Sequence, residues 1–376
     1  MTTSKIDDDS DVRLVVARDD KTRCQLVRGP TTTLADGEVL LRVERFGMTS
    51  NNVTYAALSV TMPYLDFFDA PSSDGWGVLP VWGIGRVEAS RHAGVPVGVR
   101  VFGFFPAARW VVLAPTAVKD AGFRVERPGI PPEYALYSQY QRTDVDPFHL
   151  RDYEDAMVVF RPLFLTGIAL ADYLSSKTFE DIQTIIISSA SSKTAYGLAS
   201  ALRALGARRP IVGLSSPANT PFVDSLGVYD QVDSYDAVNA IATAQSAVHV
   251  DIAGSRSVRA AIHERLGAGL RLTLSVGMTH GEAGGYSRAI EGPATEVFFA
   301  PGWMARRRGE LGEAFLPAML EGWRAQMKGV EQHFAIRRRH GPESMRDTYR
   351  ELARGGARAS DAYVVDASHG DLRDPS

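Results

Sequence analysis

Short runs of β-branched residues alternate with stretches of helical spacing in the second half of the chain. Ile185, Ile186 and Ile187 suit a buried strand, and Leu198, Leu202 and other apolar residues then recur at the spacing of one helix face. Further strands are expected at Pro210–Leu214, Ala247–Ile252 and Arg271–Val276. Because strands that alternate with helices form a parallel sheet with helices on both faces, this half is predicted to be a doubly wound α/β unit.

The first part of the chain has a different pattern, in which short strands are interrupted by glycine and proline. Glycines at 83, 85, 98 and 103 are typical of the bends and bulges at the corners of a small barrel. The segment from Pro128 to Pro147 is predicted to be an irregular linker. Alternating patterns predict strands at Glu38–Gly47, Val81–Ala89, Gly98–Phe104 and Trp110–Ala114.

Two helices and a return of β character complete the pattern. Helical spacing is expected from Asp152 to Leu174 and, as one long amphipathic helix, from Arg306 to Lys328. The segment from His333 to Asp366 is typical of strand, helix and strand, so the last strand is expected to rejoin the β-rich unit. The predicted domains are residues 1–150, completed by residues 331–376, and residues 151–330.

Composition narrows the class of protein. With 376 residues, of which 45% are hydrophobic, the chain can bury the cores of two domains. A net charge of −3 argues against nucleic acid or an anionic membrane as the main partner. The single cysteine, Cys24, excludes an internal disulfide and a zinc site of several thiolates, and no metal is expected. With no apolar run of ~18 residues recognised, a cytoplasmic protein is the expectation.

The turn that follows the three isoleucines lacks the glycines usual in a dinucleotide-binding fold. Ser191, Ser192, Lys193 and Thr194 stand where a glycine-rich fingerprint would be expected. In one interpretation, the hydroxyl groups and the lysine ammonium bind the phosphates in place of bare backbone. In the other, cofactor binding has been lost and the turn is only structural. The string SSKT resembles the end of a phosphate-binding P-loop, but the required glycines are absent.

The end of the next strand indicates which nucleotide would bind. An acidic residue there would bind a ribose 2′-hydroxyl and repel a 2′-phosphate. Ser215, Ser216 and Asn219 occupy this place instead, so NADP is predicted in preference to NAD. The alternative is a simple turn at the two serines with Asn219 as a helix cap.

Several motifs occur in a fixed order along the chain. They include EVLLRVERFGMTSNNVTY (residues 38–55), GIGRVEAS (83–90), PLFLTGIAL (162–170) and LGVY (226–229). Their order resembles that of the medium-chain dehydrogenase/reductase superfamily, in its zinc-free quinone-reductase and enoyl-reductase branch. The strings SSASSKTAYGLA, TSNNVTYA, FGFFP and FFAPGW resemble, more narrowly, a bacterial family of unknown function, DUF2855. The resemblance implies a GroES-like β-barrel catalytic domain and a Rossmann-type domain that binds NADP.

The same resemblance implies where the chemistry lies. Zinc-free members pass hydride to an activated double bond or carbonyl and often take a proton from a tyrosine near the first loop. Tyr55 and Tyr64 compete for that role, since a phenol can donate a proton and hydrogen-bond a developing enolate. Asn51 and Asn52 are expected to orient the acceptor, and the alternative is that they serve loop geometry. His280, just beyond a predicted strand, is a weaker candidate for acid–base work.

The sequence therefore predicts a zinc-independent NADPH-linked reductase of an activated double bond or a quinone-like small molecule. The alternative is a redox-neutral lyase or isomerase on the same scaffold, in which nucleotide binding has been lost or repurposed. A third possibility is a binding protein without chemistry. The expected partner is a small-molecule substrate, with neither nucleic acid nor membrane, and a homodimer is expected from the family alone.

Overall fold

The computed structural model describes residues 11–29, 33–59, 61–70, 75–176, 181–241, 246–252, 254–276 and 295–368. The chain divides into two compact units. The first has the bounds Met1–Val159, Ile336–Ala357 and Asp361–Ser376, and the second has the bounds Phe160–Ala335 and Arg358–Ser360.

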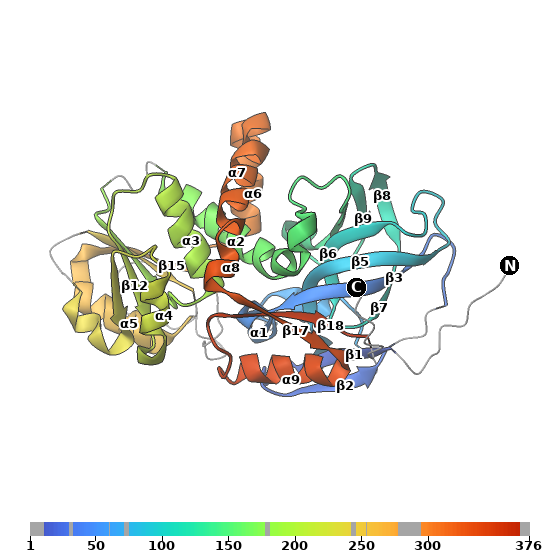
Figure 1. Cartoon of the computed structure of the whole chain (residues 1–376), viewed down its shortest axis with the longest axis horizontal. Helices are drawn as coiled ribbons and strands as arrows, with labels where there is room; N and C mark the ends of the chain where they lie inside the picture. The colour runs from blue at the N-terminus through green and yellow to red at the C-terminus, as the bar shows by residue number, and fades with distance from the viewer. Residues whose placement is uncertain are drawn as a thin grey trace. The chain divides into compact units, whose positions relative to one another are not determined.

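The first unit is built on two sheets (Figure 1). The smaller has the order β2-β1-β4, and the larger has the order β17-β18-β3-β5-β6-β10-β9-β8, with β7 also paired to β3. The strand near the C-terminus pairs antiparallel with β3, where Tyr363 lies opposite Met48. The strands are β1 Val12–Ala17, β2 Cys24–Arg28, β3 Val39–Met48, β4 Trp76–Val78, β5 Pro80–Ser90, β6 Arg100–Pro106, β7 Trp110–Leu113, β8 Pro115–Lys119, β9 Gly122–Val125, β10 Gln139–Arg142, β17 Ala335–His340 and β18 Asp361–Asp366.

The four strands predicted in this part are present, with small shifts at their ends. The segment predicted to be a linker instead contains a 3-10 helix, Pro132–Ser138, and the strand β10. Alternation was too short there to be recognised, because β10 has only 4 residues and obtains its backbone partners from β6 and β9. A strand as short as this, paired on both sides, is determined by its neighbours.

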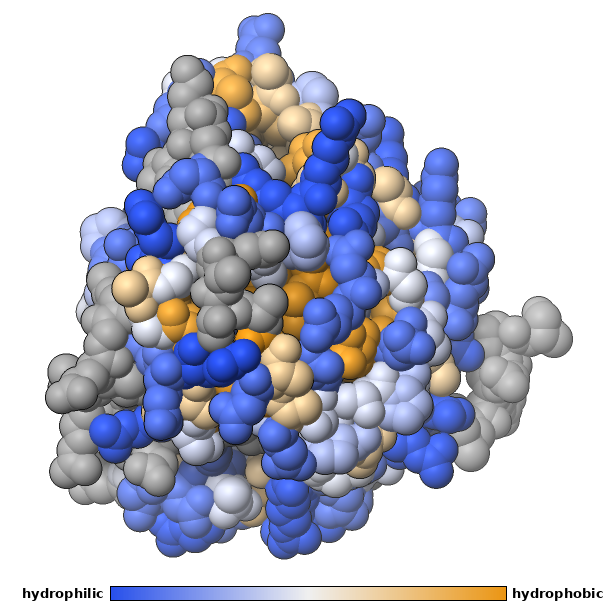
Figure 2. Space-filling model, turned by 90° about the vertical axis from the view of Figure 1, so that its left-hand side faces the viewer, coloured by the Kyte–Doolittle hydropathy of each residue, from blue (hydrophilic) through white to orange (hydrophobic). Residues whose placement is uncertain are grey.

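The second unit contains a parallel sheet with the order β13-β12-β11-β14-β15-β16. In chain order this is 3-2-1-4-5-6, the order of a doubly wound nucleotide-binding sheet, so the predicted α/β class is confirmed. Polar residues (blue) cover most of the face that Figure 2 shows, and apolar residues (orange) lie near its centre. The strands are β11 Thr184–Ser188, β12 Ile211–Ser215, β13 Gln231–Ser234, β14 Ala247–Asp251, β15 Leu270–Ser275 and β16 Thr295–Val297.

The prediction of one long helix at Arg306–Lys328 is wrong in one respect, because the chain forms two helices there. They are α6, Ala300–Leu311, and α7, Phe315–Met327. Between them Gly312 adopts a φ of 56°, a left-handed conformation that ends a helix. Apolar spacing continues through this break, which is why the sequence pattern reads as a single helix. The other helices are α1 Ser50–Ala57, α2 Glu154–Leu174, α3 Lys193–Ala204, α4 Thr220–Ser225, α5 Arg256–Leu266, α8 Val330–His333 and α9 Gly341–Ala353.

Helix α2 is the most apolar helix of the chain among those described. The segment Arg151–Leu174 contains an 18-residue window of mean hydropathy 1.5, long and apolar enough to cross a membrane. This corrects the expectation that no such run exists. Of that window, 72% is buried within the protein, as in the core helix of a soluble protein. We therefore treat α2 as a core helix.

Within the second unit α2 packs very closely on α3. A Cβ atom at Gly167 would lie 2.6 Å from the backbone carbon of Gly197 and 2.6 Å from the backbone nitrogen of Leu198. Gln326 of α7 donates from Nε2 to the Gly197 carbonyl at 2.7 Å. The approach of the two backbones therefore requires a residue without a side chain at position 167.

We predict that Gly167→Ala destabilises the protein by about 2–3 kcal/mol, because the new methyl group meets backbone that cannot move aside. Gly309→Ala is the matched control, since nothing lies within 4 Å of a Cβ atom there and the helix gains about 1 kcal/mol from alanine. Urea unfolding measures both changes. Equal effects of the two substitutions would contradict the close approach.

Candidate functional site

The turn between β11 and α3 is formed without glycine. Ser189 adopts a φ of 55°, in the left-handed region that glycine usually occupies. Its N–H donates to Tyr235 Oη at 3.0 Å, the N–H of Ala190 donates to the Leu214 carbonyl at 2.9 Å, and the N–H of Ser192 donates to the Ser189 carbonyl at 2.8 Å. Three backbone donors of the turn thus already have protein partners.

Two of the predicted phosphate-binding side chains also have partners. Ser192 is the N-cap of α3, and its Oγ accepts from the Ala195 N–H at 3.2 Å. Lys193 Nζ donates to the Ala359 carbonyl at 3.2 Å and lies 5.2 Å from the centre of the Phe334 ring. A phosphate role for either side chain stays a prediction, which would require it to exchange these contacts.

The start of α3 nevertheless carries the partial positive charge of a helix N-terminus. The first backbone N–H groups of a helix, here including that of Thr194, have no acceptor within the helix and carry its partial positive charge. No acidic residue lies in the first turn of α3. Thr194 is itself buried, with 9% of its surface exposed.

Three predicted cofactor-binding residues meet beside this turn. Ser215 Oγ donates to Ser191 Oγ at 3.2 Å, and Asn219 Nδ2 approaches the same oxygen at 3.5 Å. Ser215 is the last residue of β12, which pairs with β11, and Ser216 next to it is half-buried. Asn219 precedes α4, but its side chain makes no capping bond, so the expected helix cap is not formed by that side chain. The result is a polar cluster without a carboxylate at the carboxyl end of the first two strands.

A buried polar network next to this cluster was not recognised in the sequence. Ser188 Oγ donates to Asp251 Oδ1 at 3.2 Å and lies 3.1 Å from His249 Nε2. His249 Nδ1 lies 3.5 Å from Thr273 Oγ1, which lies 2.8 Å from His263 Nε2. All five side chains are almost completely buried. A histidine and an aspartate in the apolar run AVHVD were the available signal.

The chemistry of this network is structural. A carboxylate oxygen can only accept, so the Ser188 hydroxyl donates to Asp251 and receives its own hydrogen bond from His249. The serine thus lies between the carboxylate and the imidazole, which is the wrong order for a nucleophile activated by histidine. Burial, followed by the charges of His263 and Arg259, lowers the pKa of His249 to about 3, so its ring is neutral. The network joins β11, β14, β15 and α5 below the polar cluster.

In the first unit, the segment TSNNVTYA forms helix α1 and not the expected loop. Thr49 Oγ1 accepts from the Asn51 N–H at 3.2 Å, and Asn52 Oδ1 accepts from the Thr49 N–H at 2.8 Å, a reciprocal N-terminal cap. Asn52 Nδ2 also donates to the Pro80 carbonyl at 3.0 Å. Asn52 therefore fixes α1 to β5, while Asn51 is half-exposed; their orientation of an acceptor stays a prediction.

The two candidate tyrosines lie side by side. The ring centres of Tyr55 and Tyr64 are 4.5 Å apart, and each residue is 5% exposed. Trp82 Nε1 donates to Tyr55 Oη at 3.1 Å, and Tyr64 Oη lies 3.2 Å from Tyr137 Oη. Burial raises the pKa of Tyr55 to about 12, against the opposing effect of the Trp82 hydrogen bond, and burial also raises the pKa of Tyr64. Both phenols hold their protons at neutral pH.

These tyrosines belong to a larger group of rings in edge-on, tilted and stacked contact. The group comprises Tyr55, Tyr64, Phe67, Trp82, Phe102, Phe104, Tyr134 and Tyr137. The described residues include no group of three or more His, Cys, Asp and Glu side chains that could hold a metal ion. His280 lies outside the described residues.

Comparisons with known proteins agree with this architecture. Residues 46–358 match the sequence model of a family described as protein of unknown function (DUF2855). No curated protein matches the chain.

Solved structures match almost the whole chain. CurA from Vibrio vulnificus, crystallised with NADPH, is 16% identical, with a TM-score of 0.58 over 96% of this chain and 100% of that chain. The quinone oxidoreductase of Pseudomonas syringae pv. Tomato DC3000 is 16% identical, with a TM-score of 0.54 over 94% and 99% of the two chains. CurK enoyl reductase is 13% identical, with a TM-score of 0.54 over 95% and 99%. These matches confirm the expected fold class, a GroES-like unit and a Rossmann-type unit.

We predict that stability falls between pH 6.5 and 3 through His249. The unfolded chain binds a proton near the ordinary pKa of 6.5, whereas the folded histidine does so only near 3, so acid favours unfolding across this window. When the unfolded state binds one proton more than the folded state, the free energy of unfolding changes by about 1.4 kcal/mol per pH unit. We expect the free energy of unfolding, measured with urea from pH 7 to pH 4, to depend less steeply on pH in His249→Asn than in the native protein. Identical slopes would show that His249 titrates normally.

Proposed function

The chain belongs to the DUF2855 family of proteins of unknown function, and we propose that it is a zinc-independent NADPH-linked reductase. Its substrate would be a small molecule with an activated double bond or a quinone-like ring. The observation that carries this proposal is the polar cluster without a carboxylate, Ser191, Ser215 and Asn219, beside the start of α3 on a doubly wound sheet. Ligands of such sheets bind at the carboxyl ends of the strands, next to a helix N-terminus.

The neighbouring structures support the choice of cofactor and reaction. CurA was crystallised with NADPH, and the other two neighbours are described as a quinone oxidoreductase and an enoyl reductase. A 2′-phosphate carries negative charge, so a cluster of hydroxyl and amide groups accommodates it better than an acidic residue would. We infer that Ser191, Ser215, Ser216 and Asn219 lie at the adenosine ribose and its phosphate, with Thr194 and Lys193 at the pyrophosphate.

When bound, NADPH would supply the hydride, and the protein would supply one proton to complete a two-electron reduction. We assign that proton to Tyr55, whose phenol is held protonated by burial. The Trp82 N–H, 3.1 Å from Tyr55 Oη, would stabilise the phenolate left after transfer. Tyr64 is the alternative donor, and its bond to Tyr137 offers no comparable N–H donor. The surrounding rings favour an apolar, conjugated substrate.

One observation favours a second function. The turn after β11 has no glycine, and the backbone N–H groups of Ser189, Ala190 and Ser192 already have protein acceptors. A scaffold that had lost its nucleotide could carry out a redox-neutral lyase or isomerase reaction with the same tyrosines. Titration with NADPH and NADH, followed by nicotinamide fluorescence and by heat, separates the two functions. If neither nucleotide binds, the proposal of a reductase is overturned. The homodimer expected from the family stays a prediction.

We predict that the native protein binds NADPH with a Kd in the micromolar range and that Ser216→Asp raises this Kd at least tenfold. The introduced carboxylate would repel the 2′-phosphate, at a cost of about 1.4 kcal/mol or more. NADH affinity should change little, because NADH lacks that phosphate. Ser216→Asn is the matched uncharged control. An equal loss of NADPH and NADH binding in Ser216→Asp would place the 2′-phosphate elsewhere.

We predict that Tyr55→Phe lowers kcat by about 10²–10⁴-fold while the NADPH Kd is unchanged, since only the transferred proton is removed. The assay follows NADPH oxidation with a panel of enones and quinones. Tyr64→Phe is the matched control and should retain most of kcat. The opposite result would assign the proton to Tyr64, and full activity in both variants would contradict a tyrosine donor.

A further inference from the structure

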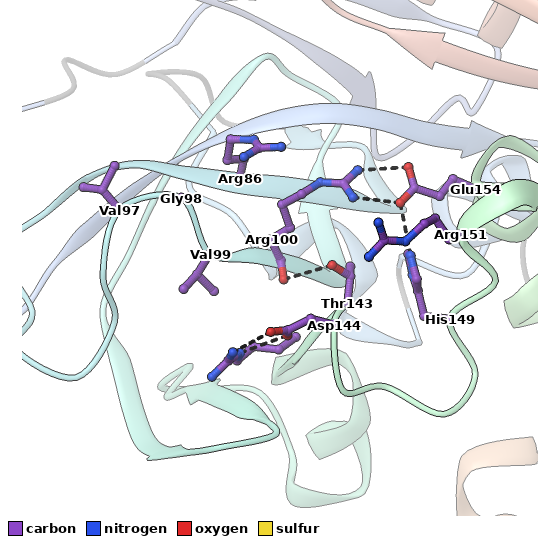
Figure 3. A pocket seen from close by; sticks show the side chains of 11 residues that line it. Arg86, Val97, Gly98, Val99, Arg100, Thr143, Asp144, His149, Arg151 and Glu154 are labelled. Carbon is purple, nitrogen blue, oxygen red and sulfur yellow. Dashed lines mark hydrogen bonds and ion pairs between the residues drawn. The ribbon is translucent and has the colours of Figure 1, made fainter.

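The first unit has a pocket that the proposed reductase chemistry does not use. It has a volume of about 660 Å³, within the range of small-molecule sites. Its lining comes from β5, β6, β10, the turn from 97 to 99, and the segment that leads into α2, and Figure 3 shows these side chains around it. The lining residues are Arg86, Val97, Gly98, Val99, Arg100, Arg142, Thr143, Asp144, His149, Arg151 and Glu154.

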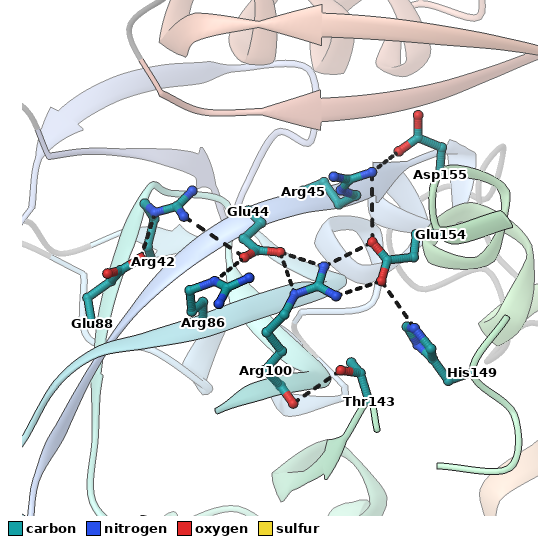
Figure 4. A network of polar contacts seen from close by, with 10 residues as sticks. All are labelled: Arg42, Glu44, Arg45, Arg86, Glu88, Arg100, Thr143, His149, Glu154 and Asp155. Carbon is teal, nitrogen blue, oxygen red and sulfur yellow. Dashed lines mark hydrogen bonds and ion pairs between the residues drawn. The ribbon is translucent and has the colours of Figure 1, made fainter. Parts of the chain in front are cut away.

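Arginines on neighbouring strands would repel one another here without carboxylates between them. Arg86 and Arg100 lie directly opposite each other on β5 and β6. Glu44 bridges them, since its Oε1 accepts from Arg86 Nε at 2.8 Å and its Oε2 accepts from Arg100 Nη2 at 2.7 Å (Figure 4). Burial raises the pKa of Glu44, but hydrogen bonds from the two arginines outweigh it and lower that pKa overall. Glu44 is therefore a fixed negative charge.

A second carboxylate completes the coordination of Arg100. Glu154, the first residue of α2, accepts from Arg100 Nη1 at 2.8 Å and Nη2 at 2.9 Å, and lies 3.1 Å from His149 Nε2. Burial is again outweighed by these bonds, so the pKa of Glu154 falls to about 2. Arg100 donates through Nε, Nη1 and Nη2 to carboxylates, which makes it part of the pocket framework and not a free donor.

Other guanidinium groups of the pocket keep free donors. Arg151 is exposed, and its guanidinium has no hydrogen-bond or ion-pair partner in the part of the chain that the structure describes. Arg86 bonds Glu44 only through Nε, and Arg142 bonds Asp144 through Nε and Nη2. Four arginines therefore face three carboxylates, Glu44, Glu154 and Asp144, and the excess positive charge is that of Arg151.

The pocket also has an apolar edge. Val97 is 60% exposed, one of the most exposed large apolar side chains of the described residues, and Val99 beside it is half-buried. Gly98 between them has a φ of 91°, so the turn that presents both valines is fixed by backbone that only glycine readily adopts. An apolar edge next to free guanidinium groups suits a molecule with one anionic and one apolar end.

We propose that this pocket binds a small organic anion, whose carboxylate or phosphate group lies against Arg151 and Arg86 and whose apolar part lies against Val97 and Val99. The guanidinium fork matches the two oxygens of either anionic group. Every lining residue belongs to the first unit, whereas the polar cluster assigned to the nucleotide belongs to the second. The pocket therefore shares no residue with the polar cluster assigned to the nucleotide.

Calorimetric titration of the full chain with butyrate, phenyl phosphate, inorganic phosphate and chloride tests this proposal. Saturable binding of butyrate or phenyl phosphate, tighter than that of inorganic phosphate or chloride, is expected, and the tighter of the two identifies the anionic group. Arg151→Gln should weaken this binding at least tenfold. Arg354→Gln, an exposed arginine of the same unit outside the pocket, should leave it unchanged.

A second variant keeps the test independent of Arg151. Val97→Asp places a negative charge at the exposed edge and should also weaken organic-anion binding at least tenfold, without loss of folding, because that side chain points mainly into solvent. No saturable binding of any of the four anions to the native protein would overturn the proposal. So would equal affinity in the native protein, Arg151→Gln and Val97→Asp.

Discussion

The left-handed backbone at Ser189 is the constraint on which the candidate nucleotide site depends. A non-glycine residue in this conformation costs about 1–2 kcal/mol, and the turn offsets that cost with hydrogen bonds from Ser189 and Ala190, each contributing about 0.5–1.5 kcal/mol. Because the Ala190 N–H bonds to β12, the turn is fixed to the strand that ends at Ser215. That attachment brings Ser191 within hydrogen-bond distance of Ser215 and Asn219.

The same arrangement is the basis of our proposal that a turn without the usual glycines binds an anion. Glycine normally allows the phosphate to approach the backbone closely. In this chain the backbone N–H groups of Ser189, Ala190 and Ser192 already donate within the protein, and the hydroxyl and amide groups of Ser191, Ser215 and Asn219 lie beside the turn that leads into α3. The buried network of Ser188, His249 and Asp251 supports these strand ends from below.

In the first unit, the main constraint is that many charged groups lie close together on neighbouring strands and at the start of α2. Glu44 and Glu154 are held ionised between arginines, and α1 is held by the two ends of the Asn52 side chain. Polar groups thereby determine where α1 and α2 begin. The aromatic group with Tyr55 and the arginine-lined pocket with Arg151 both include residues next to these helix starts, and they give the unit one apolar and one arginine-rich region.

The sequence by itself determined the fold class and the candidate residues, because strand and helix periods are local patterns that survive without tertiary information. It identified the doubly wound sheet, the barrel strands and the polar turn, but it missed the break at Gly312, the helix α1 and the buried network at His249. Tertiary structure decided which side chains are still available. Lys193 bonds Ala359, which is 166 residues away, whereas Ser191 meets Ser215 and Asn219. Hydrogen-bond partners depend on strand register and on where distant segments return, and neither is encoded in local spacing.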